Sequence, residues 1–194
     1  NSSNFTMSIW FYINEWNHKF GQNKNIMYLA NSPGAKDFIS EDTIDNIDSS
    51  ELQRITNTNY KNLNLYLGEY ENNLHIQIET YTKGGNITSS GPTGSTLQTT
   101  SITEYVIPNI EVQKWVCLTI SVDTRTMDVY LDGKLVNSYI LPGVYKPSPN
   151  NNLYLGNTNN NSFNGFVTRF RYIKNDISPE HSYSIYKDGI NSST

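Results

Sequence analysis

The chain has 194 residues, a net charge of −4 and only 16% charged residues. It lacks a cluster of basic residues, so binding to nucleic-acid phosphates is not expected. It also lacks an apolar run near the ~20 residues that a membrane-spanning helix needs. Cys117 is the single cysteine, which excludes a disulfide within the chain. This length is typical of one β-sandwich domain, and we expect residues 1–194 to form a single domain.

The first predicted strand begins at Phe5, where apolar residues alternate with others up to Ile13. Trp10 and Tyr12 add bulk to the second face, which predicts a central strand covered on both sides. A second short strand is expected at residues 26–30. Residues 31–58 then interrupt the pattern with an acidic run, and long loops in compact domains are often functional.

A hairpin is predicted next, with strands at residues 63–71 and 74–82 around Asn72-Asn73. Leucines and isoleucines alternate along one face of this pair. The other face carries polar and aromatic side chains: Tyr66, His75, Gln77, Glu79 and Tyr81. Residues 82–100 are rich in Gly, Ser and Thr, which predicts an exposed loop.

The clearest strand pattern lies between Trp115 and Ile140. Apolar residues alternate with polar ones up to a turn at residues 123–126, and the alternation resumes at Met127. Asp132-Gly133 is typical of a type I′ hairpin turn, after which a third strand is expected from Lys134. This meander has one buried face, so a second sheet must cover it.

The C-terminal part predicts two more strands and a helix. Residues 153–156 form a short strand, and residues 163–172 form a longer one. Ser178-Pro179-Glu180 is typical of a helix start, with Pro at the first helical position.

Several of these segments resemble concanavalin A-like jelly rolls of the laminin-G-like kind. The resemblance lies in five segments: the central hairpins at 115–123 and 127–136, the early strand at 5–12, the closing strand at 163–172 and the exit at 175–180. It implies an all-β fold, a two-sheet antiparallel β-sandwich with a short C-terminal helix. The family usually has one more strand before Phe5. We therefore expect the chain to be a segment of a longer polypeptide or to receive that strand from elsewhere.

The alternation also predicts the core of this sandwich. The residues expected to be buried are Phe5, Met7, Ile9, Phe11, Leu65, Leu67, Ile76, Ile78, Val116, Leu118, Ile120, Val129, Leu131 and Phe170.

Catalysis is not expected, and we predict no catalytic residues. The superfamily includes glycoside hydrolases, and retaining hydrolysis needs two carboxyl groups about 5–5.5 Å apart. On a strand these would appear as acids at alternate positions, and the nearest match, Glu69-Tyr70-Glu71, lacks the third acid of the hydrolase pattern. The chain has no Gly-x-Ser-x-Gly motif, and Cys117 lies within a predicted strand.

A calcium site is one alternative for the acidic loop. The resemblance implies calcium binding at one rim of the domain, and calcium requires six to eight oxygen ligands. Asp42, Asp45 and Asp48 are the candidate ligands, beside Asp37 and Glu41. Solvated loop carboxylates are the other interpretation, so no cofactor is required. A zinc site is not expected, because the three histidines are far apart in the sequence.

Sugar binding is the sharper hypothesis, because sugars stack on aromatic rings and hydrogen-bond to carboxamides and carboxylates. One candidate is the loop with Trp16 and His18, which is rich in Asn. The other is the polar face with Tyr66, His75, Gln77, Glu79 and Tyr81. Ordinary packing of strand tyrosines is the alternative for this face.

The sequence therefore predicts a non-catalytic recognition module, for carbohydrate binding or adhesion within a larger surface protein. The alternative is a structural component of a viral capsid, virion or other surface assembly that contacts protein partners. A glycoside hydrolase is less favoured. The expected location is extracellular, at a cell surface or at a virion surface, with a glycan or protein partner.

Overall fold

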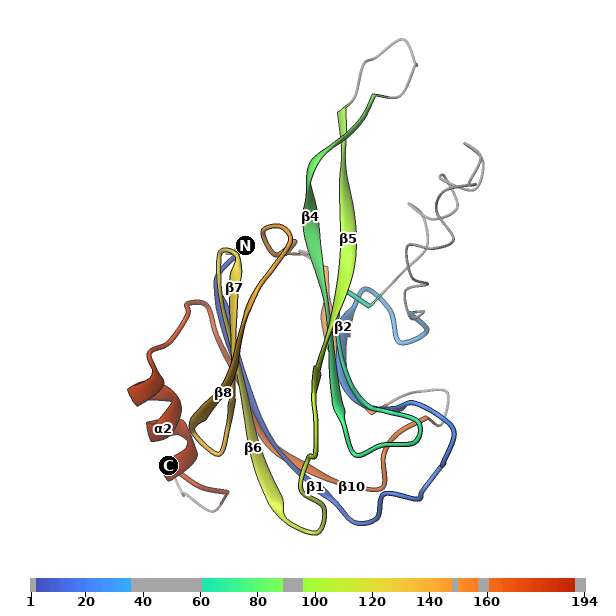
Figure 1. Cartoon of the computed structure of the whole chain (residues 1–194), viewed down its shortest axis with the longest axis vertical. Helices are drawn as coiled ribbons and strands as arrows, with labels where there is room; N and C mark the ends of the chain where they lie inside the picture. Colours follow the sequence, from blue (N-terminus) through green and yellow to red (C-terminus); the bar gives the residue numbers. More distant parts are fainter. Residues whose placement is uncertain (1–2, 36–60, 89–95, 148–149, 157–160, 191–194) are drawn as a thin grey trace.

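The computed structural model describes residues 3–35, 61–88, 96–147, 150–156 and 161–190, and it consists of two facing antiparallel sheets (Figure 1). We call them sheet A and sheet B. Sheet A has the order β10-β1-β6-β7-β8, with β1 at Phe5–Ile13, β6 at Trp115–Asp123, β7 at Thr126–Leu131, β8 at Lys134–Ile140 and β10 at Gly165–Ile173. Sheet B has the order β5-β4-β3-β2-β9, with β2 at Lys24–Ala30, β3 at Leu63–Leu67, β4 at Leu74–Thr88, β5 at Thr96–Ile107 and β9 at Asn152–Leu155. The predicted all-β sandwich is confirmed.

The core lies between the sheets and follows the predicted alternation. All the predicted core residues are buried except Leu131 and Phe170, which are partly buried and pack against the core. Each fully buried Leu, Ile or Phe stabilises the fold by about 1.5–3 kcal/mol relative to an exposed one. Trp16 also packs against this core from its loop, so the candidate aromatic is anchored to the rigid body of the domain.

The predicted meander is confirmed, including its turn. Asp132 and Gly133 have φ angles of 50° and 74°, the left-handed conformation that a type I′ turn requires. The Asp132 carboxylate accepts a 2.9 Å hydrogen bond from the Cys117 backbone N–H, which holds the turn against β6. A Cβ at Gly133 would lie 2.9 Å from the Tyr183 Cα, so the turn also allows the helix to approach closely.

The helix α2, at Pro179–Lys187, covers part of the outer face of sheet A (Figure 1). The Ser178 hydroxyl caps it by accepting from the His181 backbone N–H at 3.2 Å, as the sequence predicted. Ile185 packs against Trp10 and Cys117, so β1 is covered on both faces. Burial raises the pKa of the Cys117 thiol, as expected for a structural cysteine rather than a nucleophile.

Two predicted boundaries in sheet B were wrong. The first hairpin strand ends at Leu67 rather than at residue 71, because Gly68 N donates to Asn73 O and closes the turn. Within the predicted loop at 82–100, residues 82–88 and 96–100 are strand. β4 continues to Thr88 and pairs with β5, and the resulting ribbon extends beyond the body of the sandwich (Figure 1). The main-chain hydrogen bonds between two strands form whether the side chains are polar or apolar. The Gly84-Gly85 pair lies at a register shift of the β4–β5 pairing, between Tyr81 and Asn86, rather than in a loop.

Among the described residues, none of the helices is long and apolar enough to cross a membrane.

Candidate functional site: a pocket beside Trp16

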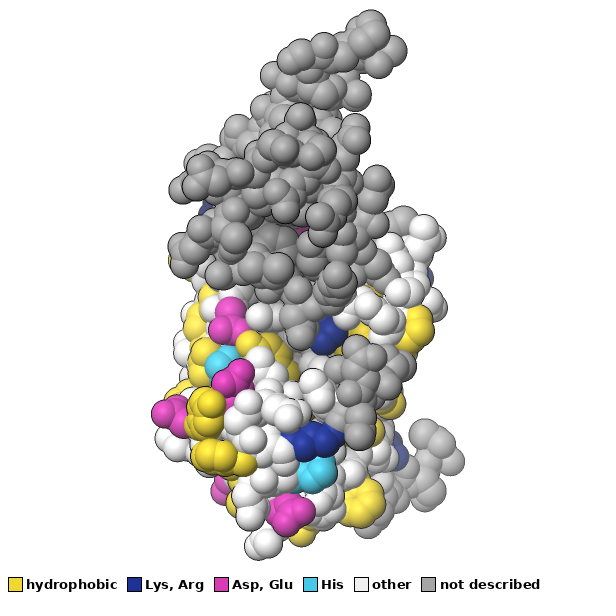
Figure 2. All heavy atoms as spheres, turned by 90° about the vertical axis from the view of Figure 1, so that its right-hand side faces the viewer, with side chains coloured by type: hydrophobic (Ala, Val, Ile, Leu, Met, Phe, Trp, Pro, Cys, Tyr) yellow, Lys and Arg dark blue, Asp and Glu magenta, His cyan; other side chains and the backbone are white. Residues whose placement is uncertain are grey.

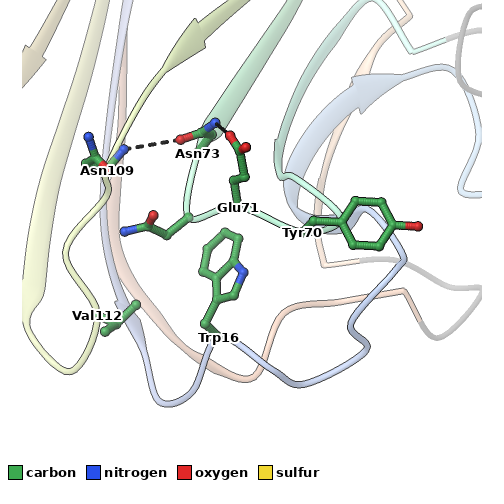
Figure 3. Close-up of a pocket in the computed structure, with 7 residues that line it drawn as sticks. Trp16, Tyr70, Glu71, Asn73, Asn109 and Val112 are labelled. Carbon is green, nitrogen blue, oxygen red and sulfur yellow. Dashed lines mark hydrogen bonds between the residues drawn. The ribbon is translucent and has the colours of Figure 1, made fainter.

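Three connections meet at one end of the sandwich and form a pocket of about 580 Å³ (Figure 3). The connections are residues 14–23 between β1 and β2, 68–73 between β3 and β4, and 108–114 between β5 and β6. The lining residues are Trp16, Tyr70, Glu71, Asn72, Asn73, Asn109 and Val112. The pocket thus combines two aromatic rings and one valine with amide and carboxylate groups.

Hydrogen bonds join the second and third connections directly. Ile110 N donates to Asn72 O at 2.7 Å, and the Asn72 amide donates back to Ile110 O at 3.1 Å. Asn109 N donates to the Asn73 side-chain oxygen at 3.3 Å, one of the bonds drawn in Figure 3. Asn109 has a φ of 58°, a left-handed conformation that Asn adopts more readily than most residues. These walls are therefore held in place without a ligand.

Lys24 joins the first connection to the second. Its side chain is 1% exposed, and its ammonium donates to the carbonyl oxygens of Gly68 at 2.8 Å and of Gln22 and Glu69 at 3.3 Å. The same nitrogen lies 4.8 Å from the centre of the Trp16 ring, a cation–π distance. Burial lowers the pKa of Lys24, and the nearby Glu69 carboxylate acts in the opposite direction.

The Trp16 ring rises from its loop towards the 70–73 turn (Figure 3). Its Nε1 atom is buried without a hydrogen-bond partner in the described part of the chain. Tyr70 lies on the outer rim, 61% exposed, and makes an edge contact with Phe20 at 5.2 Å between ring centres. His18 belongs to the same loop as Trp16 but does not line the pocket.

The second predicted site, the polar face of β3 and β4, lies on the outer face of sheet B, because its side chains alternate with core residues along both strands. Figure 2 views the molecule from the side on which sheet B lies. There Tyr66 stacks on His75 with 4.8 Å between ring centres. Gln77 donates to Glu104 at 3.1 Å, and the Tyr66 hydroxyl donates to the same carboxylate. Tyr66 is only 6% exposed, so its ring does not offer a stacking platform.

Glu104 completes this cluster, and the sequence reasoning missed it. It lies on β5, the strand that was not predicted, opposite Gln77. Its carboxylate is 3.5 Å from His75 Nδ1. The His75 ring is the main cause that lowers the pKa of Glu104, and Tyr66 and Gln77 add to it, whereas burial acts in the opposite direction.

Glu79 and Tyr81 share this face of β4 but belong to another group of contacts. The Glu79 carboxylate accepts from Lys146 and Thr100, both at 2.8 Å, and from Asn62 at 2.8 Å. Tyr81 N donates to the Val144 carbonyl oxygen. These bonds attach residues 141–147 to sheet B, so the five predicted residues split into two clusters with structural contacts.

The candidate calcium ligands Asp42, Asp45 and Asp48 lie outside the described residues, as do Asp37 and Glu41. Within the described ranges, no group of three or more His, Cys, Asp or Glu side chains could hold a metal ion. Calcium binding by the acidic loop stays a prediction.

The two-sheet fold indicates a family relationship, and a comparison with known protein families identifies that family. The family model described as the concanavalin A-like lectin/glucanases superfamily matches residues 1–181. The chain belongs to this superfamily. A comparison with curated protein sequences found no significant match.

Solved structures of botulinum neurotoxin binding domains have the same fold as this superfamily member. The binding domain of botulinum neurotoxin DC in complex with SialylT is 12% identical, with a TM-score of 0.58. The comparison covers 96% of this chain and 36% of that one. The binding domain of botulinum neurotoxin serotype G is 15% identical, with a TM-score of 0.53. That comparison covers 96% of this chain and 37% of the other. The chain thus spans little more than a third of these neighbours, and at such identities the likeness concerns the fold.

Proposed function

We propose that the chain is a non-catalytic recognition module that binds carbohydrate through the Trp16 pocket, within a larger protein at a cell or virion surface. The observation that carries this proposal is the Trp16 ring, held by Lys24 at a pocket whose other lining residues include three carboxamides and a carboxylate. This is the combination that a sugar ring requires, with an aromatic surface for its C–H groups and polar atoms for its hydroxyls.

The size and rigidity of the pocket support binding. Its volume of about 580 Å³ lies within the roughly 300–1,000 Å³ typical of small-ligand pockets. The bonds between Asn72 and Ile110, and between Asn73 and Asn109, hold the walls before a ligand arrives. Pre-organised walls reduce the entropy lost on binding, which favours affinity.

The comparisons support recognition as the general role. The superfamily name covers lectins and glucanases. One structural neighbour is a toxin binding domain in complex with SialylT, and another is such a domain in complex with rat synaptotagmin II. Those two toxin domains thus have a SialylT ligand and a protein partner, which supports recognition of a glycan or a protein as the general role here.

The pocket lining argues against hydrolysis. Glycoside hydrolysis uses a pair of carboxyl groups across the scissile bond. Glu71 is the one acidic side chain among the lining residues, and its carboxylate accepts a 2.8 Å hydrogen bond from Asn73. The pocket is thus equipped to hold a sugar rather than to cleave it.

A glycan array probed with the 194-residue chain tests the proposal, followed by calorimetry on the hits. We expect Trp16→Ala to abolish binding, while Phe166→Ala, an aromatic that is 58% exposed on β10, leaves it unchanged. Tyr66→Ala tests the outer face of sheet B. Hits that disappear only with Tyr66→Ala would move the site to that face, and an array without hits would contradict carbohydrate binding.

A structural role in a surface assembly is the second candidate, and the edge strand β8 favours it. Ile140 is 80% exposed, and Leu135 and Val136 on the same strand are 49% and 44% exposed. An exposed apolar edge of this kind is typical of a contact with another polypeptide. An array without hits, together with a protein partner whose binding Ile140→Lys abolishes, would favour this role.

A further inference from the structure

We infer that the Trp16 pocket selects uncharged sugar residues and excludes anionic ones such as sialic, uronic or sulfated sugars. This inference rests on the proposed function and adds the class of ligand. It differs from what the sialylated ligand of the toxin neighbour suggests, and it depends on the charges around the pocket.

The lining residues carry a negative charge and no positive one. Glu71 supplies a carboxylate, and the other lining side chains are neutral. The first two connections also contain a further glutamate each, Glu15 and Glu69, whereas Glu111 in the third is paired with Lys114. An anionic group 4 Å from the Glu71 carboxylate would weaken binding roughly fivefold in bulk water.

Two lysines near the pocket already bind other groups of the protein. The Lys24 ammonium is buried against three backbone carbonyl oxygens and the Trp16 ring. Lys114 pairs with Glu111 and lies 3.7 Å from Asp132. Lys19 lies in the first connection but does not line the pocket. An anionic sugar would therefore meet no lining cation, whereas proteins usually bind anions through Arg, Lys or clustered N–H groups.

The hydrogen-bonding groups of the pocket include an acceptor for hydroxyl donors. The Asn72 amide uses an N–H on Ile110 O, and the Asn73 amide uses an N–H on Glu71 Oε2. Glu71 is acceptor-only and has a second oxygen, Oε1. Sugar hydroxyls can donate to such oxygens, whereas a ligand carboxylate can only accept. Val112, which is 40% exposed, adds an apolar surface that suits the C–H face of a neutral sugar ring.

Matched pairs of glycans test this inference. Each pair consists of a neutral oligosaccharide and the same oligosaccharide with a terminal sialic acid or a sulfate, titrated with the 194-residue chain at low salt. We expect the neutral member to bind at least tenfold more tightly, in a Trp16-dependent manner. We expect Glu71→Gln to reduce this ratio to about threefold or less, and 0.5 M NaCl to reduce it as well, since salt screens exposed charges.

Glu180→Gln is the matched control, because it removes an exposed carboxylate on α2, which does not line the pocket, and should leave the ratio unchanged. Trp16-dependent binding that favours the anionic member would overturn this inference and leave the proposed function intact. A ratio that Glu71→Gln does not alter would overturn it as well. Absence of any Trp16-dependent binding would overturn both.

Discussion

The Lys24 ammonium lies 4.8 Å from the centre of the Trp16 ring and donates a 2.8 Å hydrogen bond to the Gly68 carbonyl oxygen. One buried side chain thereby joins the loop that carries the ring to the turn that carries Glu71. Lys24 touches the ring on the protein side, so we regard it as a positioning residue. Its loss should affect both the fold and the pocket.

Lys24→Met keeps much of the side-chain length but removes the donor. Carbonyl oxygens in the 68–73 turn would then be buried without their donor, at a cost of about 1–3 kcal/mol. We expect the free energy of unfolding in urea to fall by about 2 kcal/mol, and the affinity for glycan to fall as the ring loosens. Lys134→Met, on the exposed strand β8, should change stability by less than about 0.5 kcal/mol. Equal effects of the two variants would contradict the role given to Lys24.

Substitutions at Asn109 separate the contribution of its side chain to glycan binding from the contribution of its backbone conformation to stability. At its φ of 58°, Asn109→Gly removes the carboxamide without backbone strain, whereas Asn109→Ala adds a strain of about 1 kcal/mol. We expect the alanine variant to be less stable than the glycine variant in thermal unfolding. Both variants should bind glycan more weakly than the wild type. If the glycine variant binds as well as the wild type, the Asn109 carboxamide does not contact the ligand.

Glu104 should make stability depend on pH on the acid side. The pKa of Glu104 in the folded protein is below its ordinary value of 4.5. The unfolded chain therefore takes up the proton first, and the contribution of Glu104 is complete above about pH 4.5 and is lost as the pH falls through the lower, folded value. We expect the wild type to lose more stability than Glu104→Gln between pH 6 and pH 3, measured by urea unfolding.

Tyr66→Phe is the partner variant for this measurement, because it keeps the ring stacked on His75 but removes the hydroxyl that donates to Glu104. Its acid-side loss should be intermediate between the wild type and Glu104→Gln. Parallel pH profiles for all three proteins would show that this cluster does not set acid stability.

Gly143 should not tolerate a side chain. A Cβ at this position would lie 1.6 Å from the Tyr81 backbone carbonyl oxygen, so residues 141–147 could not pair with β4 without moving. We expect Gly143→Ala to destabilise the protein by about 3 kcal/mol. Gly34→Ala is the control, because a Cβ there would meet nothing within 4 Å. Similar melting temperatures for the two variants would contradict the close approach at Gly143.

The sequence predicted the meander of sheet A well and sheet B less well. Residues 116–123 and 127–132 alternate between core-facing apolar residues and others, and an Asp-Gly turn marks the hairpin, so these strands follow from local pattern alone. β5 carries a polar, Thr-rich sequence, and its pairing with β4 depends on main-chain hydrogen bonds that no alternation reveals. Glu104 was missed for that reason, and the polar face was predicted without the carboxylate at its centre.

The sequence by itself determined which side chains face the core, because neighbours two positions apart on a strand share a face. It also indicated Trp16 as a candidate ligand contact, because the ring lies in a polar loop. Only the tertiary structure decided that Trp16, Asn72 and Asn109 line one pocket. These residues lie on three separate connections, and their meeting depends on the order and register of the strands. Strand order and register are set by the packing of the whole sandwich rather than by any local stretch of sequence.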